Sequence, residues 1–240
     1  MLKKTKLTIQ IIILILIILG VGYYFINEFY LKNKYYKFEK SNITLEQIFE
    51  FKVMRNDLNE EQIQDYQDRF DSKVLNVFAA EDNFNFSALN SIGNIKRILY
   101  DFEGARDVWE YVGYMREENS LSFFNLGNLY AEDLKDNKKA EENFLKCLEN
   151  STGEAGNEQY YLGIVNFYKY YYSEKKQKIE KILLDSLKTE EYKNNQTILS
   201  LLATYYGDNN QPIKALEYWQ KILVMDPENE GVKLEIENLK

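Results

Sequence analysis

Pairs of adjacent residues, the first large and aliphatic and the second very small, recur along this chain at a nearly constant spacing. They are Ile92-Gly93, Leu126-Gly127, Leu162-Gly163 and Leu202-Ala203. The steps from each small residue to the next are 34, 36 and 40 residues. A period of this length is typical of repeat proteins, in which every repeat is one supersecondary unit stacked on its neighbours. The spacing therefore predicts a row of similar units.

The clearest unit, at residues 196–229, predicts two helices joined by a tight turn. Its first helix has apolar or small residues at positions i, i+3, i+4 and i+7, which form one helical face: Leu199, Leu202, Ala203 and Tyr206. The second helix begins at Pro212, where the missing N–H costs nothing. It ends before Pro227, because the residue that precedes a proline resists the helical conformation.

The second helix of a unit has its own marker, an alanine followed four residues later by a large aromatic residue. These pairs are Ala105-Trp109, Ala140-Phe144 and Ala215-Trp219. Small residues on both helices let the two backbones approach closely, and the aromatic ring fills the space beside that contact. The unit that contains Leu162-Gly163 is less regular and has an expanded turn. No helix pair can bury both of its faces alone, so the pairs are expected to stack.

This joint spacing resembles the tetratricopeptide repeat, a helix-turn-helix unit of about 34 residues with the pattern W-x2-L-G-x2-Y, then A-x3-F, then a late proline. The resemblance implies an all-α fold, an α-solenoid of such repeats. We assign three repeats, one degenerate repeat and a capping helix: 86–119, 120–154 and 196–229, then 155–195, then 230–240. Residues 42–85 predict a further helical pair with Asn42 and Asn59 as N-caps, which we interpret as a degenerate first repeat.

Residues 7–26 form an apolar run without a single charge, LTIQIIILILIILGVGYYFI. At about 1.5 Å per residue, a helix of this length matches the roughly 30 Å core of a bilayer. We interpret it as a transmembrane helix that follows a basic tail, residues 1–6, and precedes a juxtamembrane connector, residues 27–41. A cleaved secretory signal and a buried core helix are the alternatives. No Ala-x-Ala-like cleavage site follows the run, which favours the anchor.

The short tail MLKKTK favours a cytoplasmic N-terminus. The repeats would then lie outside the plasma (inner) membrane, and the chain would be a single-pass protein. Four lysines that follow the span oppose this orientation, although two glutamates partly offset them: Lys32, Lys34, Lys37 and Lys40, with Glu28 and Glu39. The tail is short and ends in a free amine, so we retain the cytoplasmic N-terminus.

The composition excludes several kinds of function. The net charge of −8 repels phosphate backbones, so we expect no nucleic-acid partner. Histidine is absent, which removes the commonest general base and metal ligand. The single cysteine, Cys147, cannot form an intramolecular disulfide and falls at a position that predicts core packing. The adjacent acid pairs do not face each other on a helix and predict solvated charge. We therefore predict no enzymatic activity, no cofactor and no metal site.

Aromatic residues are concentrated in the segment NEQYYLGIVNFYKYYYSEKK, residues 157–176. At 100° per residue these rings cannot all lie on one helical face. Some are expected in the core and some at the surface. The exposed rings have two interpretations, surplus packing residues or a patch that contacts a peptide, because tyrosine supplies rigid contact area at interfaces.

The resemblance also implies where a partner binds. In tetratricopeptide proteins the first helices of successive repeats line a concave groove for peptides, and some members hold a C-terminal carboxylate there with Lys, Asn and Arg side chains. In this chain we predict that the groove binds its partner through Asn90, Asn94, Asn125, Asn128, Tyr161 and Thr204. Asn90 stands at the lysine position, so this carboxylate clamp is incomplete. The alternative interpretation is a solvated polar inner face.

Together these inferences predict a membrane-anchored scaffold that binds a protein or peptide partner. By analogy with bacterial envelope proteins of this build, it would assist cell-envelope assembly or secretion. Two alternatives remain. One is a structural subunit that self-assembles into homo-oligomers. The other is an accessory subunit of an enzyme complex.

Overall fold

The computed structural model describes residues 43–79, 85–151 and 157–239. Within these ranges the regular structure consists of eleven α-helices, one π-helical segment and one 3-10 turn. The chain divides into two compact units, Met1–Glu50 and Phe51–Lys240. No helix of the described ranges is both long and apolar enough to span a membrane. The tail, the predicted span and the connector, residues 1–41, lie outside them.

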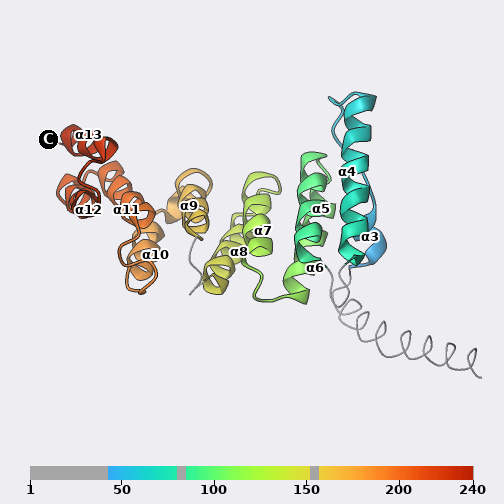
Figure 1. Ribbon diagram of the computed structural model, residues 1–240, viewed down its shortest axis with the longest axis horizontal. Coiled ribbons are helices and arrows are strands. Elements are labelled where there is room, and N and C mark those ends of the chain that lie inside the picture. Colours follow the sequence, from blue (N-terminus) through green and yellow to red (C-terminus); the bar gives the residue numbers. More distant parts are fainter. Residues whose placement is uncertain (1–42, 80–84, 152–156, 240) are drawn as a thin grey trace, which may run out of the picture. The chain divides into compact units, whose positions relative to one another are not determined.

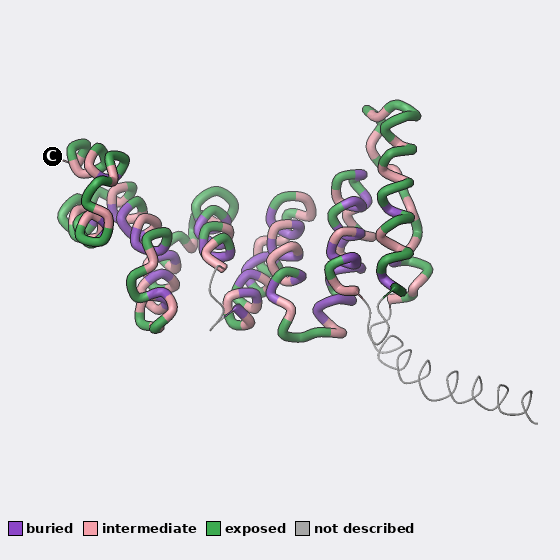
Figure 2. The backbone as a smooth tube through the Cα atoms, in the orientation of Figure 1, coloured by how far each residue is buried: buried purple, intermediate pink, exposed green. Residues whose placement is uncertain are grey.

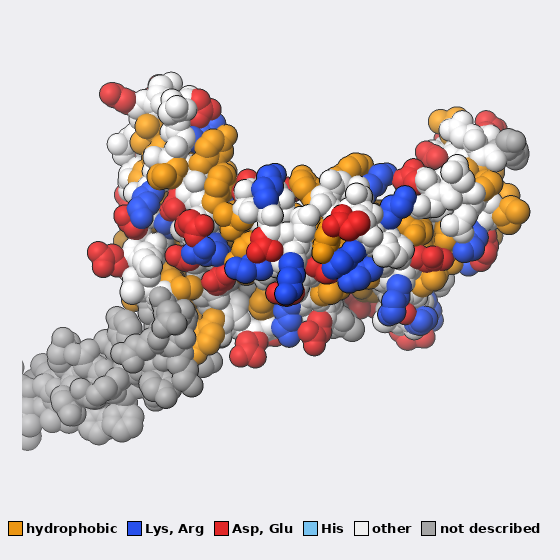
Figure 3. Space-filling view, turned by 180° about the vertical axis from the view of Figure 1, so that it is seen from behind, with side chains coloured by type: hydrophobic (Ala, Val, Ile, Leu, Met, Phe, Trp, Pro, Cys, Tyr) orange, Lys and Arg blue, Asp and Glu red, His pale blue; other side chains and the backbone are white. Residues whose placement is uncertain are grey.

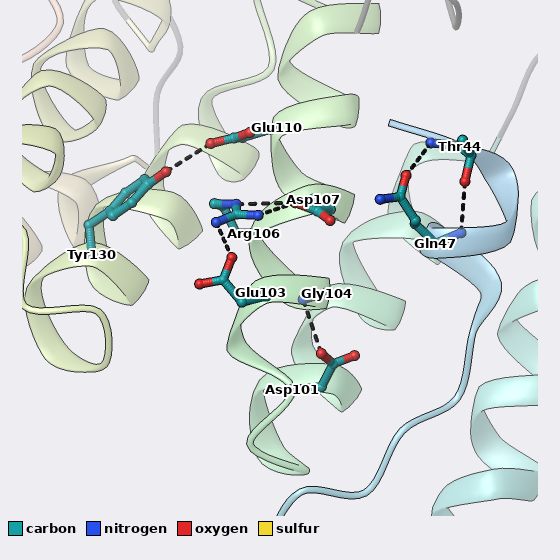
Figure 4. A network of polar contacts seen from close by, with 9 residues as sticks. All are labelled: Thr44, Gln47, Asp101, Glu103, Gly104, Arg106, Asp107, Glu110 and Tyr130. Atoms are coloured by element: carbon teal, nitrogen blue, oxygen red, sulfur yellow. Dashed lines mark hydrogen bonds and ion pairs between the residues drawn. The ribbon is translucent and has the colours of Figure 1, made fainter. Parts of the chain in front are cut away.

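The described residues of the first unit, 43–50, form one short helix, α3 (Leu45–Phe49). Its N-cap is Thr44, whose hydroxyl oxygen accepts a hydrogen bond from the Gln47 backbone N–H at 3.2 Å. The Gln47 side chain accepts in return from the Thr44 N–H at 2.7 Å, which completes a capping box (Figure 4). The prediction of Asn42 as the cap is therefore wrong. A Thr-x-x-Gln box satisfies two free amides at once, and it sets the helix start at Leu45.

The second unit begins with an extended stretch where we predicted helix. Its residues make tertiary contacts that a helix would forbid. Phe51 packs edge-on against Phe70 with ring centroids 5.3 Å apart, and the Met54 N–H donates to the Leu99 carbonyl at 2.9 Å. The first member of the predicted pair at 42–85 is thus the five-residue α3 alone. The second member is a full helix, and its predicted cap Asn59 is confirmed by a capping box with Gln62.

Ten α-helices follow in the second unit. They are α4 (Glu60–Phe78), α5 (Phe86–Ile98), α6 (Phe102–Met115), α7 (Ser120–Glu132), α8 (Asn137–Asn150), α9 (Glu158–Asn166), α10 (Lys178–Ser186), α11 (Gln196–Asp208), α12 (Pro212–Met225) and α13 (Glu230–Asn238). From α4 to α13, consecutive helices pack against one another (Figure 1). From α5 onward they form the antiparallel pairs α5–α6, α7–α8, α9–α10 and α11–α12. Figure 2 shows that these helices have one buried and one exposed face.

Each pair begins with an asparagine, and this residue sets the period of the array. Asn85, Asn119, Asn157, Asn195 and Asn229 are the N-caps of α5, α7, α9, α11 and α13. All except Asn157 accept a hydrogen bond from a backbone N–H three residues further on. The steps between these caps are 34, 38, 38 and 34 residues.

This period corrects the register of the third pair. The small residues Gly93, Gly127 and Ala203 all lie eight positions after their asparagine cap, and the same position in α9 is Val165. Ile164 and Val165 are buried, whereas Leu162 is 45% exposed. The predicted equivalence of Leu162-Gly163 with the other pairs is therefore wrong by two residues. Gly163 makes a different close contact, with the ring of Phe124 on α7.

The close approach within the other pairs is confirmed. A Cβ added to Gly93 would lie 2.4 Å from Nε1 of Trp109, and one added to Gly127 would lie 2.8 Å from the Phe144 ring. The alanines of the second helices are completely buried: Ala105, Ala140 and Ala215. Cys147 is buried in the core as predicted, and burial raises the pKa of its thiol above the ordinary value.

Three of the pairs turn in the same way. A residue in the left-handed conformation follows the first helix, and the next residue caps the second. These left-handed residues are Tyr100, Lys135 and Asn210, with φ of 66°, 58° and 56°. The third pair lacks this turn. There α9 continues into a π-helix, η2 (Phe167–Tyr171), and a 3-10 turn, η3 (Ser173–Lys175). The expanded turn predicted for this pair is thus an irregular helical segment.

The aromatic segment divides as its periodicity predicts. Tyr160, Tyr161, Phe167 and Tyr168 are buried, whereas Tyr170 is 67% exposed and Tyr171 is 39% exposed. The π-helix adds a residue to the turn, so that Phe167 and Tyr168 both face the core.

Candidate functional site

Two cavities open beside the first helices of neighbouring pairs. The α7–α9 cavity measures about 280 Å³ and is lined from α7, α8, α9 and η2. The α9–α11 cavity measures about 370 Å³ and is lined mainly from α9, η2 and α11. Leu162 and Asn166, one turn apart on α9, line both cavities. We call the two cavities together the first-helix groove.

Aromatic and aliphatic side chains form the floor of the groove. In the α7–α9 cavity the Phe124 ring packs over Gly163, 5.9 Å from the Phe144 ring and 5.0 Å from the Tyr160 ring. A side chain at position 163 would collide with this ring, because an added Cβ would lie 2.3 Å from it. The glycine therefore lets α9 approach α7 closely at the α7–α9 cavity.

The rim of the groove carries carboxamides that are free to bind a ligand. Asn128 and Gln159 line the α7–α9 cavity, and Asn166 lines both cavities. Among the described residues none of these three side chains has a hydrogen-bond partner. A carboxamide offers both a donor and an acceptor, so it can match the N–H and C=O of a peptide backbone.

The charges around the groove are mostly paired. Lys169 donates to Asp208 across the α9–α11 cavity at 2.6 Å, and this hydrogen bond raises the pKa of Lys169. Glu132, beside the other cavity, accepts from Arg97 at 2.5 Å. Elsewhere Lys and Arg side chains alternate with Asp and Glu over the face shown in Figure 3. The exception in the groove is Lys176, which lines the α9–α11 cavity and has no ion-pair partner among the described residues.

Two of the six predicted partner-binding residues line the groove. Asn128 belongs to the α7–α9 cavity and Thr204 to the α9–α11 cavity. Asn94 is exposed on α5, beside neither cavity. The structure does bring Asn125 and Asn90 together, since the Asn125 amide donates to the Asn90 side chain at 3.4 Å.

The other two predicted residues are buried. Asn90 is 3% exposed and its amide donates to the Phe86 carbonyl at 3.0 Å. Tyr161 is 7% exposed and packs edge-on against Tyr192 at 5.1 Å. Burial, with a smaller contribution from Glu191, raises the pKa of Tyr161 to about 12. Both side chains therefore present little surface to a partner.

Several residues of the groove were missed by sequence reasoning, among them Leu162, Asn166, Lys169 and Lys176. Leu162 was assigned to the core because Leu162-Gly163 resembles the buried pairs of the other units. The asparagine period does not correct this assignment, because it makes Leu162 the equivalent of Asn90, Phe124 and Ser200, none of which is exposed. Lys176 follows the irregular segment η3, for which the repeat pattern has no equivalent position.

The fold and the groove define an all-helical protein of stacked antiparallel helix pairs. The chain matches no protein-family model, and no curated protein matches it in sequence. Within the described ranges, no group of three or more His, Cys, Asp or Glu side chains is placed to hold a metal ion.

Proposed function

We propose that the protein is a membrane-anchored scaffold that binds a segment of a partner protein in its first-helix groove. The observation that carries the proposal is the pair of cavities that meet at Leu162 and Asn166. Together the two cavities extend along the first helices of successive pairs. Proteins built of stacked helix pairs bind extended chains on this surface. Their lining combines an apolar floor with a few polar groups, which is typical of binding sites.

Three features favour a scaffold over an enzyme. The groove carries no pair of titratable side chains arranged as nucleophile and base. The ion pair of Lys169 with Asp208 holds η2 and α11 together. The chain contains no histidine. By analogy with membrane-anchored tetratricopeptide proteins, we assign the scaffold to cell-envelope assembly or secretion. The apolar run at residues 7–26 supports the anchor.

Leu162→Glu tests the groove. Leu162 is 45% exposed and faces both cavities, so a carboxylate there places charge on the apolar floor without emptying the core. Affinity capture of the tagged chain from solubilised membranes should recover a defined partner, and Leu162→Glu should reduce that recovery at least about tenfold. Leu145→Glu is the matched control, since Leu145 is 41% exposed on α8 and lines neither cavity.

Two results would reject the assignment. Equal recovery with Leu162→Glu and with the unmodified chain would place the partner elsewhere on the molecule. Recovery of the chain's own untagged copies alone would favour the self-assembling subunit.

A further inference from the structure

We propose that the α9–α11 cavity selects a peptide in which a large apolar side chain is adjacent to an acidic one. This inference rests on the proposed function, because it names the chemistry of the ligand for the same groove. It depends on three observations: the size and lining of the cavity, the charge at its rim and the carboxamides that lead away from it.

The cavity is the right kind of pocket for a large apolar group. Its volume of about 370 Å³ lies within the range of about 300–1,000 Å³ that is typical of ligand pockets, whereas the 280 Å³ of the neighbouring cavity falls below it. Five apolar or aromatic side chains line the cavity: Leu162, Val165, Ile179, Leu201 and Tyr205. Burying one aromatic ring there would remove much apolar surface from water.

The rim of the cavity has a positive charge that no described residue neutralises. It carries Lys169, Lys176 and Asp208. Lys169 and Asp208 form an ion pair, so their charges neutralise each other. Lys176 remains, exposed and without an ion-pair partner among the described residues. In a chain of net charge −8 this is an unusual local excess. A carboxylate beside the apolar group would complement it.

The carboxamides favour a peptide over a free amphiphilic acid. A fatty acid would satisfy the apolar floor and Lys176 alone. A peptide would also use Asn166 at the junction of the two cavities and Gln159 and Asn128 beyond it. These side chains have no hydrogen-bond partner among the described residues, and spaced carboxamides suit the alternating donors and acceptors of an extended backbone.

The test uses the full chain in nanodiscs of zwitterionic lipid. The chain is applied to an array of nine-residue Gly/Ser peptides in which two adjacent central positions carry every pair of amino acids. We expect the array to retain the chain mainly on peptides that pair an aromatic or large aliphatic residue with an acidic one. Fluorescence anisotropy with the Phe-Asp peptide then measures affinity. Replacing its Phe by Ala should weaken binding about 10- to 100-fold.

Two variants assign the specificity to the cavity. Lys176→Glu should weaken binding of the Phe-Asp peptide about three- to tenfold and should favour the Phe-Lys peptide instead. Lys138→Glu is the matched control, because Lys138 is an exposed lysine of α8 that lines neither cavity, and it should change nothing. Thr204→Trp, which fills the cavity from an exposed position, should abolish binding of every peptide.

The remaining outcomes separate this inference from the proposed function. If the chain binds peptides with basic or purely polar pairs, and Leu162→Glu abolishes that binding, the proposed selectivity is overturned. The groove would still be the binding site. An affinity for the Phe-Asp peptide that is unchanged in Lys176→Glu would also overturn it. Displacement of the peptide by decanoate at lower concentration would identify an amphiphilic acid as the ligand. Retention of no peptide would overturn the inference, and the partner capture would then decide the function separately.

Discussion

One position in each first helix decides how closely a pair can pack. Eight residues after the asparagine cap stand Gly93, Gly127, Val165 and Ala203. At the two glycines the aromatic ring of the second helix occupies the space of the missing side chain, at 2.4 Å and 2.8 Å from where a Cβ would lie. Such distances are far below van der Waals contact, so only glycine fits unless the backbones separate. Val165 forbids the same approach, and α9 belongs to the pair with the irregular turn.

We therefore expect Gly93→Ala to lower the free energy of unfolding by about 1–3 kcal/mol, although alanine is the better helix former. The added methyl would collide with the buried indole of Trp109. Gly207→Ala is the matched control. Its added Cβ would meet nothing nearer than Leu239 at 4.0 Å, so this change should stabilise the chain by up to about 1 kcal/mol. Urea unfolding followed by circular dichroism measures both. Equal and favourable effects would contradict the packing argument.

At the scale of the helices, a tyrosine and a glutamate connect each of the last three pairs to the pair before it. Eleven residues after the cap, Tyr130, Tyr168 and Tyr206 donate to Glu110, Glu141 and Glu180 on the preceding second helix at 2.8, 2.7 and 2.8 Å. Figure 4 shows the first of these bonds. In α5 the same position holds Lys96, which is buried, pairs with Asp101 at 2.9 Å and lies 5.8 Å from the Phe70 ring of α4.

Glu141 makes the most extensive of these connections. It accepts from Tyr168, from Lys175 at 2.9 Å and from Lys178 at 2.6 Å, so it holds η2, η3 and α10 against α8. Burial opposes its ionisation, but the hydrogen bonds from Lys178, Lys175 and Tyr168 outweigh burial and lower its pKa from the ordinary 4.5 to about 2. The folded chain thus holds the ionised form more strongly than the unfolded chain does.

The sign of the pH dependence follows from this lowered pKa. The stability that Glu141 contributes is complete above its unfolded pKa of about 4.5 and is lost as the pH falls toward about 2. Glu141→Gln should cost about 2 kcal/mol at pH 7, and the difference from the unmodified chain should shrink below pH 4.5. Urea unfolding across this range measures it, with Glu142→Gln, at the exposed neighbour, as control. A cost that does not vary with pH would contradict the ionic origin.

The helices and their pairing could be predicted from the sequence because periodicity and turn chemistry are local properties. Ala215, Trp219, Pro212 and Asp226 carried enough information to place α12 to the residue. The register of α9 could not be predicted from the Leu-Gly pair. A glycine can serve contact with the previous pair as well as contact within its own, and the packing of Phe124 over Gly163 shows that this glycine serves the former.

Of the six residues predicted to bind a partner, only Asn128 and Thr204 line the first-helix groove. The resemblance names positions, and it does not say whether a side chain at that position is already used by the fold. Asn90 is engaged by Phe86 and Asn125. Lys176 depends on η3, whose 3-10 geometry has no signature in the repeat pattern. For both Asn90 and Lys176, contacts between residues far apart in the sequence decide whether the side chain is available to a ligand.

At the scale of the whole molecule, our proposal has two parts: the stacked pairs present the first-helix groove to a partner, and one N-terminal segment determines where the groove is displayed. The apolar run at residues 7–26 predicts that this place is a membrane surface. The basic tail of residues 1–6 predicts that the second unit faces away from the cytoplasm. A partner would then approach the groove from outside the membrane.

Fractionation and protease accessibility test this arrangement. The full chain, carrying a C-terminal epitope and expressed in a bacterium, should remain with the membranes in high salt and alkali and be released by detergent. Deletion of residues 1–26 should transfer it to the soluble fraction, because the remaining chain lacks the uncharged run. Protease added to intact spheroplasts should remove the epitope, and protection until lysis would reverse the orientation. A membrane-free product shortened by about the length of the run would instead identify a cleaved signal.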